Sequence, residues 1–253
     1  MLGGDPVSFA LYRTKRKINM EFPNIDYKYW LDNWTKSIGE QKTYSNKNML
    51  EFIKFTDDTN SCTEEIFNIV KLGKTDKKSV LRVVDLIYSW GGPSGRLFYA
   101  AFNGQNAPRV DLENNESVFG KYFDGIKLAK LGKPESIKIF CKIRGIGSSY
   151  ASKHAYFWSS DSENPLIIVD SKIAGSLGYR TIGNLEVKSN YAKTVESFKN
   201  KAIIEFNESN PSKIERALFS FHNHYFLNDN SGWKNSHQSK DHLEAVRLSK
   251  VLF

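Results

Sequence analysis

The chain has 253 residues, which corresponds to one large domain or two small ones. About 40% of the residues are apolar and 25% are charged, a globular mixture that excludes collagen, low-complexity disorder and a disulfide scaffold. The 36 basic and 28 acidic residues give a net charge of +8. Such an excess favours a polyanionic partner, either nucleic acid or an anionic membrane surface.

A membrane partner has little support in the sequence. No apolar run approaches the roughly 18 residues that a spanning helix needs. The basic cluster at residues 13–17 follows the weak N-terminal apolar stretch, whereas a signal peptide has the reverse order. Two cysteines, Cys62 and Cys141, are too few for a thiolate metal site. We therefore expect a cytoplasmic protein with no metal, no cofactor and no membrane partner.

The predicted elements are mostly helices. Residues 1–60 are polar and irregular, with two short helices at 27–38 and 48–55, and we expect them to pack on a helical domain formed by residues 61–253. From residue 63 to Trp90 the apolar residues recur at helical spacing. Further helices are predicted at residues 94–102 with Ser94 as N-cap, 117–131, 134–143, 148–158, 188–206 and 211–226.

The segment from Pro165 to Asp170 has a different pattern. Its residues are largely β-branched and apolar, and it stops at Asp170-Ser171 before another helical pattern. Because it is isolated among helices, we expect a buried connecting strand and no sheet. No internal repeat or flexible linker interrupts the chain, so the predicted fold is mostly α and two-lobed.

The most informative motif is a hairpin between two helices, spanning residues 134–158. It contains Arg144-Gly145-Ile146-Gly147-Ser148-Ser149. Glycines let a phosphate approach the main chain closely, and the next helix start offers unpaired N–H groups and the positive end of its dipole. Five basic residues against one acid surround the motif: Lys133, Lys138, Lys142, Arg144 and Lys153 against Glu135. The motif predicts a phosphate-binding surface, although a tight helix–helix turn is the alternative.

With Asp170, which lies 23 residues beyond Gly147, this hairpin resembles the helix-hairpin-helix superfamily of DNA glycosylases. The resemblance covers residues 81–226, most strongly 143–174, and is nearest to the bacterial 8-oxoguanine-glycosylase-like branch. Some members of that branch act in phage defence, on glucosylated cytosines. The resemblance implies a fold of two helical lobes with a central cleft. It also implies that the hairpin residues bind DNA phosphates and that Asp170 is the catalytic carboxylate. By their positions, Lys142 and Lys172 are further candidates for phosphate contacts, with a solvated face as the alternative for Lys172.

The chemistry of Asp170 can also be argued without the family. Cleavage of a glycosidic bond develops positive charge on the sugar, so a nearby anion stabilises the transition state more than the ground state. A helix N-terminus favours the carboxylate form of such a residue. The alternative role for Asp170 is that of a helix N-cap alone.

One position departs from the family pattern. Bifunctional members carry a lysine two positions after the second glycine, where it forms a Schiff base with the sugar, but this chain has Ser149 there. We therefore expect a monofunctional enzyme that uses water and leaves an abasic site, and 8-oxoguanine itself becomes doubtful as the substrate. Lys153, one helical turn further on, is a second catalytic candidate, although a phosphate contact is its more ordinary role.

The family match also suggests where a flipped base lies. By that match Phe219 stacks on the base and Glu215 reads its edge; cytosine N4 and guanine N1 and N2 all suit a carboxylate. Trp90 and His222 are further pocket candidates. Ordinary core packing is the alternative for the two aromatic residues, and surface or core placement is the alternative for His222. A solvated ion pair with a lysine or arginine is the alternative for Glu215.

Two functional hypotheses follow. The first is a DNA glycosylase that acts as a monomer on double-stranded DNA, flips a modified base and hydrolyses its N-glycosidic bond, in repair of oxidised guanine or in antiphage defence against modified cytosine. The second is a non-catalytic helix-hairpin-helix DNA-binding module. A third, weaker reading is an RNA-binding protein, which would prefer single strands.

Overall fold

The computed structural model describes residues 20–37, 42–56, 58–179 and 181–227. Within these ranges the chain is mostly helical, as predicted, and β-pairing is limited to an isolated bridge between Phe102 and Gln105. The elements are α1 Tyr27–Ser37, α2 Lys47–Leu50, α3 Thr59–Lys71, α4 Lys77–Trp90, the 3-10 helix η1 Pro93–Phe98, α5 Pro108–Asn114, α6 Glu116–Lys130, α7 Ser136–Phe140, α8 Ser148–Trp158, α9 Ser171–Ser176, α10 Val187–Phe206 and α11 Ser212–Leu227.

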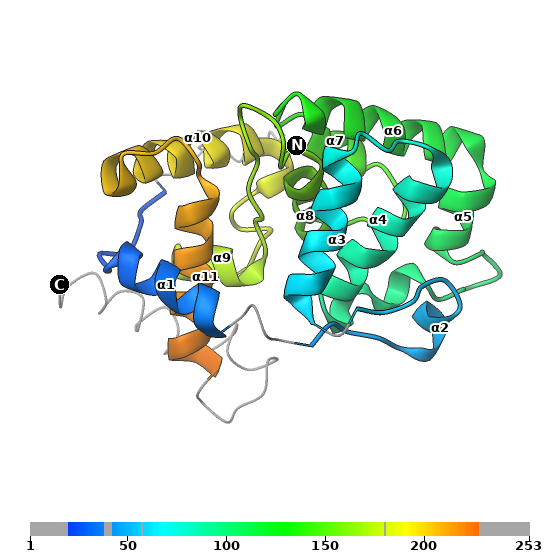
Figure 1. Cartoon of the computed structure of the whole chain (residues 1–253), viewed down its shortest axis with the longest axis horizontal. Helices are drawn as coiled ribbons and strands as arrows, with labels where there is room; N and C mark the ends of the chain where they lie inside the picture. Colours follow the sequence, from blue (N-terminus) through cyan, green and yellow to red (C-terminus); the bar gives the residue numbers. More distant parts are fainter. Residues whose placement is uncertain (1–19, 38–41, 57, 180, 228–253) are drawn as a thin grey trace, which may run out of the picture.

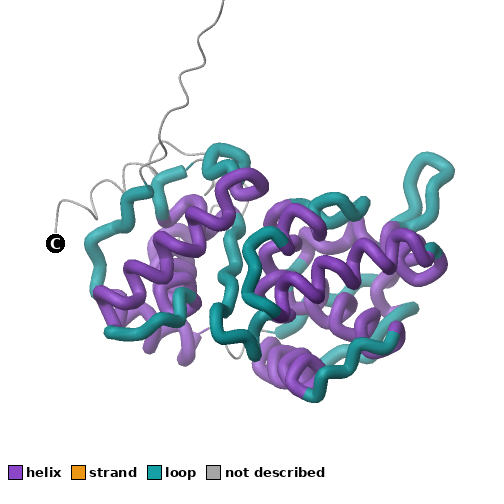
Figure 2. Tube along the Cα trace, turned by 90° about the horizontal axis from the view of Figure 1, so that it is seen from above, coloured by secondary structure: helices purple, strands orange, loops and turns teal. Residues whose placement is uncertain are grey.

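The helices form two groups that lie side by side (Figures 1 and 2). Helices α2 to α8 make one group, and α1, α9, α10 and α11 make the other. The first helix therefore packs with the last, and the ring of Trp30 in α1 meets the edge of Phe221 in α11 at 5.7 Å. After α8, residues 159–169 cross from the first group to the second and end at Asp170.

The helix predicted at residues 94–102 is wrong. The chain instead forms the short η1, which begins after Gly92 without a side-chain cap, so Ser94 is not an N-cap. Gly92 has a φ of +83°, and the proline that follows it starts a tight turn. A Cβ at Gly95 would lie 2.7 Å from atoms of Tyr88 and Tyr150, so this turn is packed too closely for a longer regular helix.

The segment at residues 165–170 forms no strand, but as expected it is a buried connection outside any sheet, with residues 166–169 buried. Side chains replace a strand partner. The Oγ of Ser152 accepts a hydrogen bond from the Val169 N–H at 2.9 Å, and the Oγ of Ser159 accepts one from the Leu166 N–H at 2.9 Å. The hydroxyl of Tyr191 donates to the Ile167 carbonyl at 2.5 Å. Because these groups satisfy the buried backbone, the segment needs no neighbouring strand.

A buried ion pair fixes the segment that leads into α5, a helix that the sequence analysis did not predict. Arg109 donates two hydrogen bonds to the carboxylate of Asp85, at 2.8 and 3.0 Å, and the Tyr99 hydroxyl donates a third at 2.7 Å. Such a pair requires all its partners, since a buried charge without them is costly. This network holds Pro108 in place, and Pro108 packs directly against the hairpin.

Candidate functional site

The hairpin between α7 and α8 depends on Gly145. This residue has a φ of +83°, and a Cβ at its position would lie 2.8 Å from the side chain of Pro108. Its carbonyl accepts a hydrogen bond from the Tyr88 hydroxyl at 3.1 Å. Ile146 is 3% exposed, so its side chain anchors the hairpin in the core. Gly145 is thus required by the fold itself.

Gly147 is different, because nothing in the fold requires a glycine there. Its φ is −79°, and no heavy atom lies within 4 Å of where its Cβ would be. The residue is exposed and precedes α8, whose start has no side-chain cap. The first N–H groups of a helix have no partner within it, so this end of α8 offers an anion open access to the backbone.

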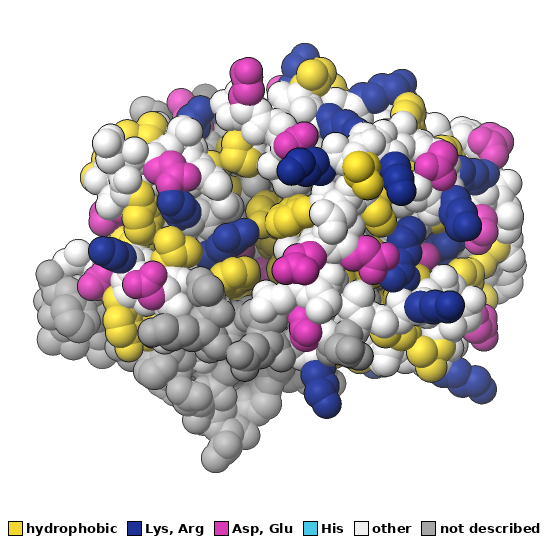
Figure 3. Space-filling view, viewed as in Figure 1, with side chains coloured by type: hydrophobic (Ala, Val, Ile, Leu, Met, Phe, Trp, Pro, Cys, Tyr) yellow, Lys and Arg dark blue, Asp and Glu magenta, His cyan; other side chains and the backbone are white. Residues whose placement is uncertain are grey.

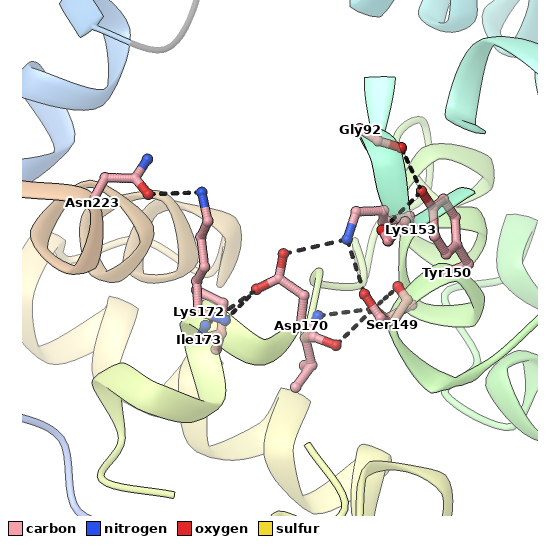
Figure 4. Close-up of polar contacts among 11 residues, drawn as sticks. Gly92, Ser149, Tyr150, Lys153, Asp170, Lys172, Ile173 and Asn223 are labelled. Atoms are coloured by element: carbon pink, nitrogen blue, oxygen red, sulfur yellow. Dashed lines mark hydrogen bonds and ion pairs between the residues drawn. The ribbon is translucent and has the colours of Figure 1, made fainter. Parts of the chain in front are cut away.

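Asp170 begins α9. Its Oδ1 accepts hydrogen bonds from the N–H groups of Lys172 and Ile173, at 3.0 and 3.2 Å. The side chain is 13% exposed, so it is neither sealed in the interior nor free in solvent. The N-cap interpretation is therefore correct for one oxygen of the carboxylate, while the other oxygen points away from the helix (Figure 4).

That second oxygen faces Lys153. The Nζ of Lys153 lies 3.3 Å from Asp170 Oδ2 and 3.2 Å from the Oγ of Ser149, in the first turn of α8 (Figure 4). The structure therefore brings Asp170, Lys153 and the hairpin together. The side chain of Lys153 is only 5% exposed, which corrects the expectation that it contacts phosphate from an open surface.

A second lysine lies on the other side of the carboxylate. Lys172 donates to Asn223 Oδ1 at 2.7 Å, and its Nζ lies 4.2 Å from the centre of the Phe219 ring. Burial lowers the pKa of Lys172 to about 8 although Asp170 opposes this shift. Its head group is held at the wall of the site, so the open phosphate contact predicted for Lys172 requires it to leave Asn223.

The two lysines keep Asp170 ionised. Burial by itself raises the pKa of this carboxyl, but the ammonium groups of Lys153 and Lys172 and the hydrogen bond from the Ile173 N–H outweigh it. The pKa of Asp170 consequently lies below its ordinary value. A fixed anion at the edge of a cleft is suited to stabilising a developing positive charge.

Two basic residues of the hairpin are placed differently from each other. Lys142 is exposed, as a phosphate contact requires. Arg144 is exposed too, but its guanidinium donates to Gln105 Oε1 at 2.9 Å, to Asp111 Oδ2 at 2.6 Å and to the Asn106 carbonyl. Arg144 therefore ties the hairpin to the loop before α5, and a phosphate would compete with Asp111 for it.

A narrow pocket lies between the two groups of helices, and Ile168, two residues before Asp170, is part of its lining. Figure 3 shows the surface hollowed there, with hydrophobic side chains in the hollow. The lining combines aromatic and aliphatic side chains with polar groups: Trp34, Thr63, Trp90, Tyr156, Phe157, Ile168, Glu215, Arg216 and Phe219. Its free volume is about 30 Å³, which holds a water molecule. A ligand larger than water would therefore fit only if these side chains moved apart.

Glu215 is the unusual group of this pocket. It is 5% exposed, and burial raises its pKa to about 8, with Arg216 opposing the shift and the Asp170 charge adding to it. No ion pair of Glu215 occurs in the described part of the chain, because Arg216 donates instead to the Tyr156 hydroxyl at 2.7 Å and lies over Trp34. The solvated ion pair considered for Glu215 is thus excluded, and burial favours the protonated form of its carboxyl group at neutral pH.

The remaining pocket candidates have different outcomes. Phe219 and Trp90 both line the pocket and are half-buried; Trp90 donates from its indole to Thr63 Oγ1 at 3.0 Å. His222 is fully buried and is not among the lining residues that the structure describes, so the core interpretation holds for it. Trp34 and Arg216 were missed, and Trp34 reaches the pocket only because α1 packs against α11.

No helix in the described ranges combines the length and the apolar character needed to cross a bilayer. Compared with known proteins, the chain matches no family model, no curated protein and no solved structure.

Proposed function

We propose that the protein is a monofunctional DNA glycosylase that uses the helix-hairpin-helix fold. The observation that carries this proposal is the continuity of the site. Lys153 and Ser149 join an ionised Asp170 to the hairpin, which has open backbone N–H groups. Ile168, two residues before Asp170, is part of the aromatic pocket. Each component has a task in base excision, which needs a strand clamp, a receptor for the flipped base and an anion near the sugar.

The hairpin provides the clamp. A phosphate at Gly147 meets the positive end of the α8 dipole and no obstructing side chain. Lys142 adds a cation to the same surface. Because Ser149 lies in the first turn of α8 and contacts Lys153, a strand bound at the hairpin passes close to Asp170.

Asp170 provides the anion. In this proposal Oδ2, which contacts Lys153, also faces the deoxyribose of a flipped nucleotide, and its charge stabilises the oxocarbenium-like species as the base leaves. Water then attacks the sugar, and an abasic site remains. The role of Lys153 in this scheme is to hold Asp170 in place and ionised, and Lys172 and Phe219 form the wall against which the base is received.

The base is received between Phe219 and Trp90, with Glu215 at its edge. A protonated carboxyl group donates one hydrogen bond and accepts another, so it matches an edge that carries an acceptor next to a donor. Cytosine N3 and N4 form such an edge, and so do guanine O6 and N1. Both an oxidised guanine and a modified cytosine consequently remain within the proposed substrate class.

The test is excision from duplexes that contain one oxidised, deaminated, alkylated or glucosylated base, with alkali cleavage to reveal abasic sites. Asp170→Asn is expected to abolish excision and to retain DNA affinity, while the exposed control Asp161→Asn behaves as wild type. If wild type and Asp170→Asn are equally inactive on every duplex yet bind DNA, the non-catalytic binding module is the correct alternative.

A further inference from the structure

Lys172 is a half-buried cation whose hydrogen-bond partner is neutral. It is the second residue of α9, and its Nζ donates to Asn223 Oδ1 at 2.7 Å. Both oxygens of the neighbouring Asp170 have other partners: Oδ1 accepts from the first N–H groups of α9, and Oδ2 accepts from Lys153 at 3.3 Å. Of the two lysines beside the carboxylate, Lys153 therefore contacts the anion, whereas the head group of Lys172 contacts an amide.

The amide of Asn223 is oriented for this contact. An ammonium group only donates hydrogen bonds, so the oxygen of the amide, and not its nitrogen, must face Lys172. The nitrogen, Nδ2, is buried and has no hydrogen-bond partner among the residues that the structure describes. Because a buried donor without a partner is unfavourable, it is the contact with Lys172 that accounts for the orientation of this side chain.

The amine of Lys172 also contacts the wall of the pocket. Its Nζ lies 4.2 Å from the centre of the Phe219 ring, and Phe219 is part of the pocket lining. In the proposed function the base stacks on this ring, so a base received there lies next to the amine. Figure 4 shows the side chains of Lys172 and Asp170 pointing to the same side, with Asp170 between the two lysines. The anion and the amine thus face one region from adjacent positions.

The surroundings of Lys172 favour the release of its proton. Burial lowers the pKa of the amine from 10.5 to about 8, and Lys153 of α8 adds to this shift while Asp170 opposes it. Helix α11 faces the amine with the uncharged side chains of Asn223 and Phe219. An acid whose pKa lies near the working pH transfers a proton to a reacting group efficiently and is readily reprotonated.

We propose that Lys172 is the catalytic acid that protonates the departing base. The C1′–N bond breaks, its electron pair goes to the base, and Nζ donates a proton to a ring nitrogen or a carbonyl oxygen of that base. Asp170 stabilises the positive charge on the sugar, and water adds to C1′ and releases a proton to solvent. The amine then recovers a proton from solvent, so the base leaves as a neutral molecule. This inference rests on the proposed function.

The test is single-turnover excision at several pH values, from duplexes that contain 8-oxoguanine, 5-hydroxymethylcytosine or 5-formylcytosine. Wild type should lose activity as the pH rises through about 8, because the amine loses the proton that it donates. Lys172→Met should lack this alkaline limb and excise about a hundredfold more slowly, the lower end of what a general acid contributes. The loss should be smaller for 5-formylcytosine than for 5-hydroxymethylcytosine, because its electron-withdrawing group makes the base leave more easily.

Three further variants separate proton donation from other roles. Lys172→Arg keeps the positive charge but supplies no proton, because a guanidinium stays protonated in proteins, so it should be as slow as Lys172→Met. Glu215 also has a pKa of about 8, and Glu215→Gln should retain the alkaline limb. Lys193→Met removes an exposed charge from α10 and should behave as wild type. The duplex affinity and the melting temperature of Lys172→Met show whether binding and folding are intact.

The inference is overturned by an alkaline limb that persists in Lys172→Met or disappears in Glu215→Gln, or by full activity of Lys172→Arg. A Lys172→Met protein that binds the duplex more weakly but excises at the wild-type rate when saturated also overturns it, and assigns the phosphate contact predicted from the sequence. A wild-type protein that excises no base from any duplex rejects the proposed function itself, and this inference with it.

Discussion

Lys153 and Asp170 face each other across the start of α9, with 3.3 Å between Nζ and Oδ2. They lie on different helices, and Lys153 is one turn beyond Ser149, where bifunctional relatives of the resembled family carry their lysine. The lysine therefore reaches the site from a new position on the same helix face. Its amine contacts a carboxylate and the Ser149 hydroxyl.

Replacing Lys153 by Met keeps most of the side-chain volume and removes the charge. The pKa of Asp170 is then expected to rise, because Lys153 lowers this pKa more than Lys172 does and would no longer oppose the effect of burial. Excision should fall at least tenfold at neutral pH, and the acidic limb of its pH profile should move to higher pH. The exposed control Lys142→Met should leave this limb in place and weaken only DNA binding.

Borohydride trapping distinguishes a nucleophilic Lys153 from a Lys153 that only holds Asp170 in place. If water is the nucleophile, incubation of wild-type protein and substrate duplex with borohydride should yield no covalent protein–DNA adduct. An adduct that disappears in Lys153→Met would contradict the monofunctional mechanism and assign the amine as nucleophile.

Glu215 makes stability depend on pH. Its pKa is about 8 in the folded state and close to 4.5 in an unfolded chain, so the folded state holds a proton that the unfolded state has lost between these values. The free energy of unfolding should therefore fall as pH rises from about 4.5 to 8. Since one pKa unit corresponds to about 1.4 kcal/mol, a difference of about 3.5 units gives a contribution that reaches about 5 kcal/mol.

Glu215→Gln removes this titration, because an amide stays neutral. Urea unfolding at several pH values should show the variant gaining stability over wild type as pH rises toward 8, with little difference near pH 4.5. The exposed Glu163→Gln change is the control. Parallel curves for wild type and Glu215→Gln would show that the carboxyl group is ionised in the folded protein.

The two glycines of the hairpin have different expected roles, Gly145 in stability and Gly147 in DNA binding. Gly145→Ala places a Cβ against Pro108 at a φ of +83°, and we expect a loss of stability of about 1 to 3 kcal/mol. Gly147→Ala meets no atom of the protein, so stability should change by less than about 1 kcal/mol. Its methyl group stands where a phosphate approaches, and duplex affinity should drop. Unchanged duplex affinity in Gly147→Ala would contradict the proposed clamp.

Ser152 connects α8 to the segment before Asp170. Its Oγ accepts from the Val169 N–H and donates to the Ser149 carbonyl at 2.8 Å. Ser152→Ala leaves a buried N–H without a partner, at a cost of about 1 to 3 kcal/mol, and lets Asp170 shift. We expect a lower melting temperature and a lower kcat, with DNA affinity retained. Ser162→Ala, in the loop beyond α8, is the comparison.

Local patterns predicted most helices and the outline of the site. The start of α8 at Ser148 and the N-cap role of Asp170 follow from residue types that act on their nearest neighbours in the chain. The extended segment before Asp170 was read as a strand because β-branched residues favour that state. Hydroxyl groups from α8 and α10 supply its partners instead, and no local pattern reveals a partner that is 17 or 24 residues away.

For the pocket too, local sequence patterns predicted some of the lining residues and missed others. Glu215 and Phe219 are one turn apart on α11, so the sequence predicts that they share a helix face. Trp34 lines the pocket only because α1 packs on α11, which no local pattern predicts. The burial of Lys153 was not readable either, because five basic residues near the hairpin suggested an exposed surface. Its burial depends on Asp170 approaching from α9, which is a property of the assembled fold.

The hydroxyl groups that bond to residues 165–170 have a consequence for heating. Ser152 and Ser159 belong to α8 and its end, and Tyr191 belongs to α10. If any of these hydroxyl groups loses its contact, a buried amide or carbonyl is left without a hydrogen-bond partner. We therefore expect residues 165–170 not to loosen gradually on heating. The position of the carboxylate and the packing of the two helix groups are then lost in a single cooperative transition. Activity and the folded fraction should share one melting curve.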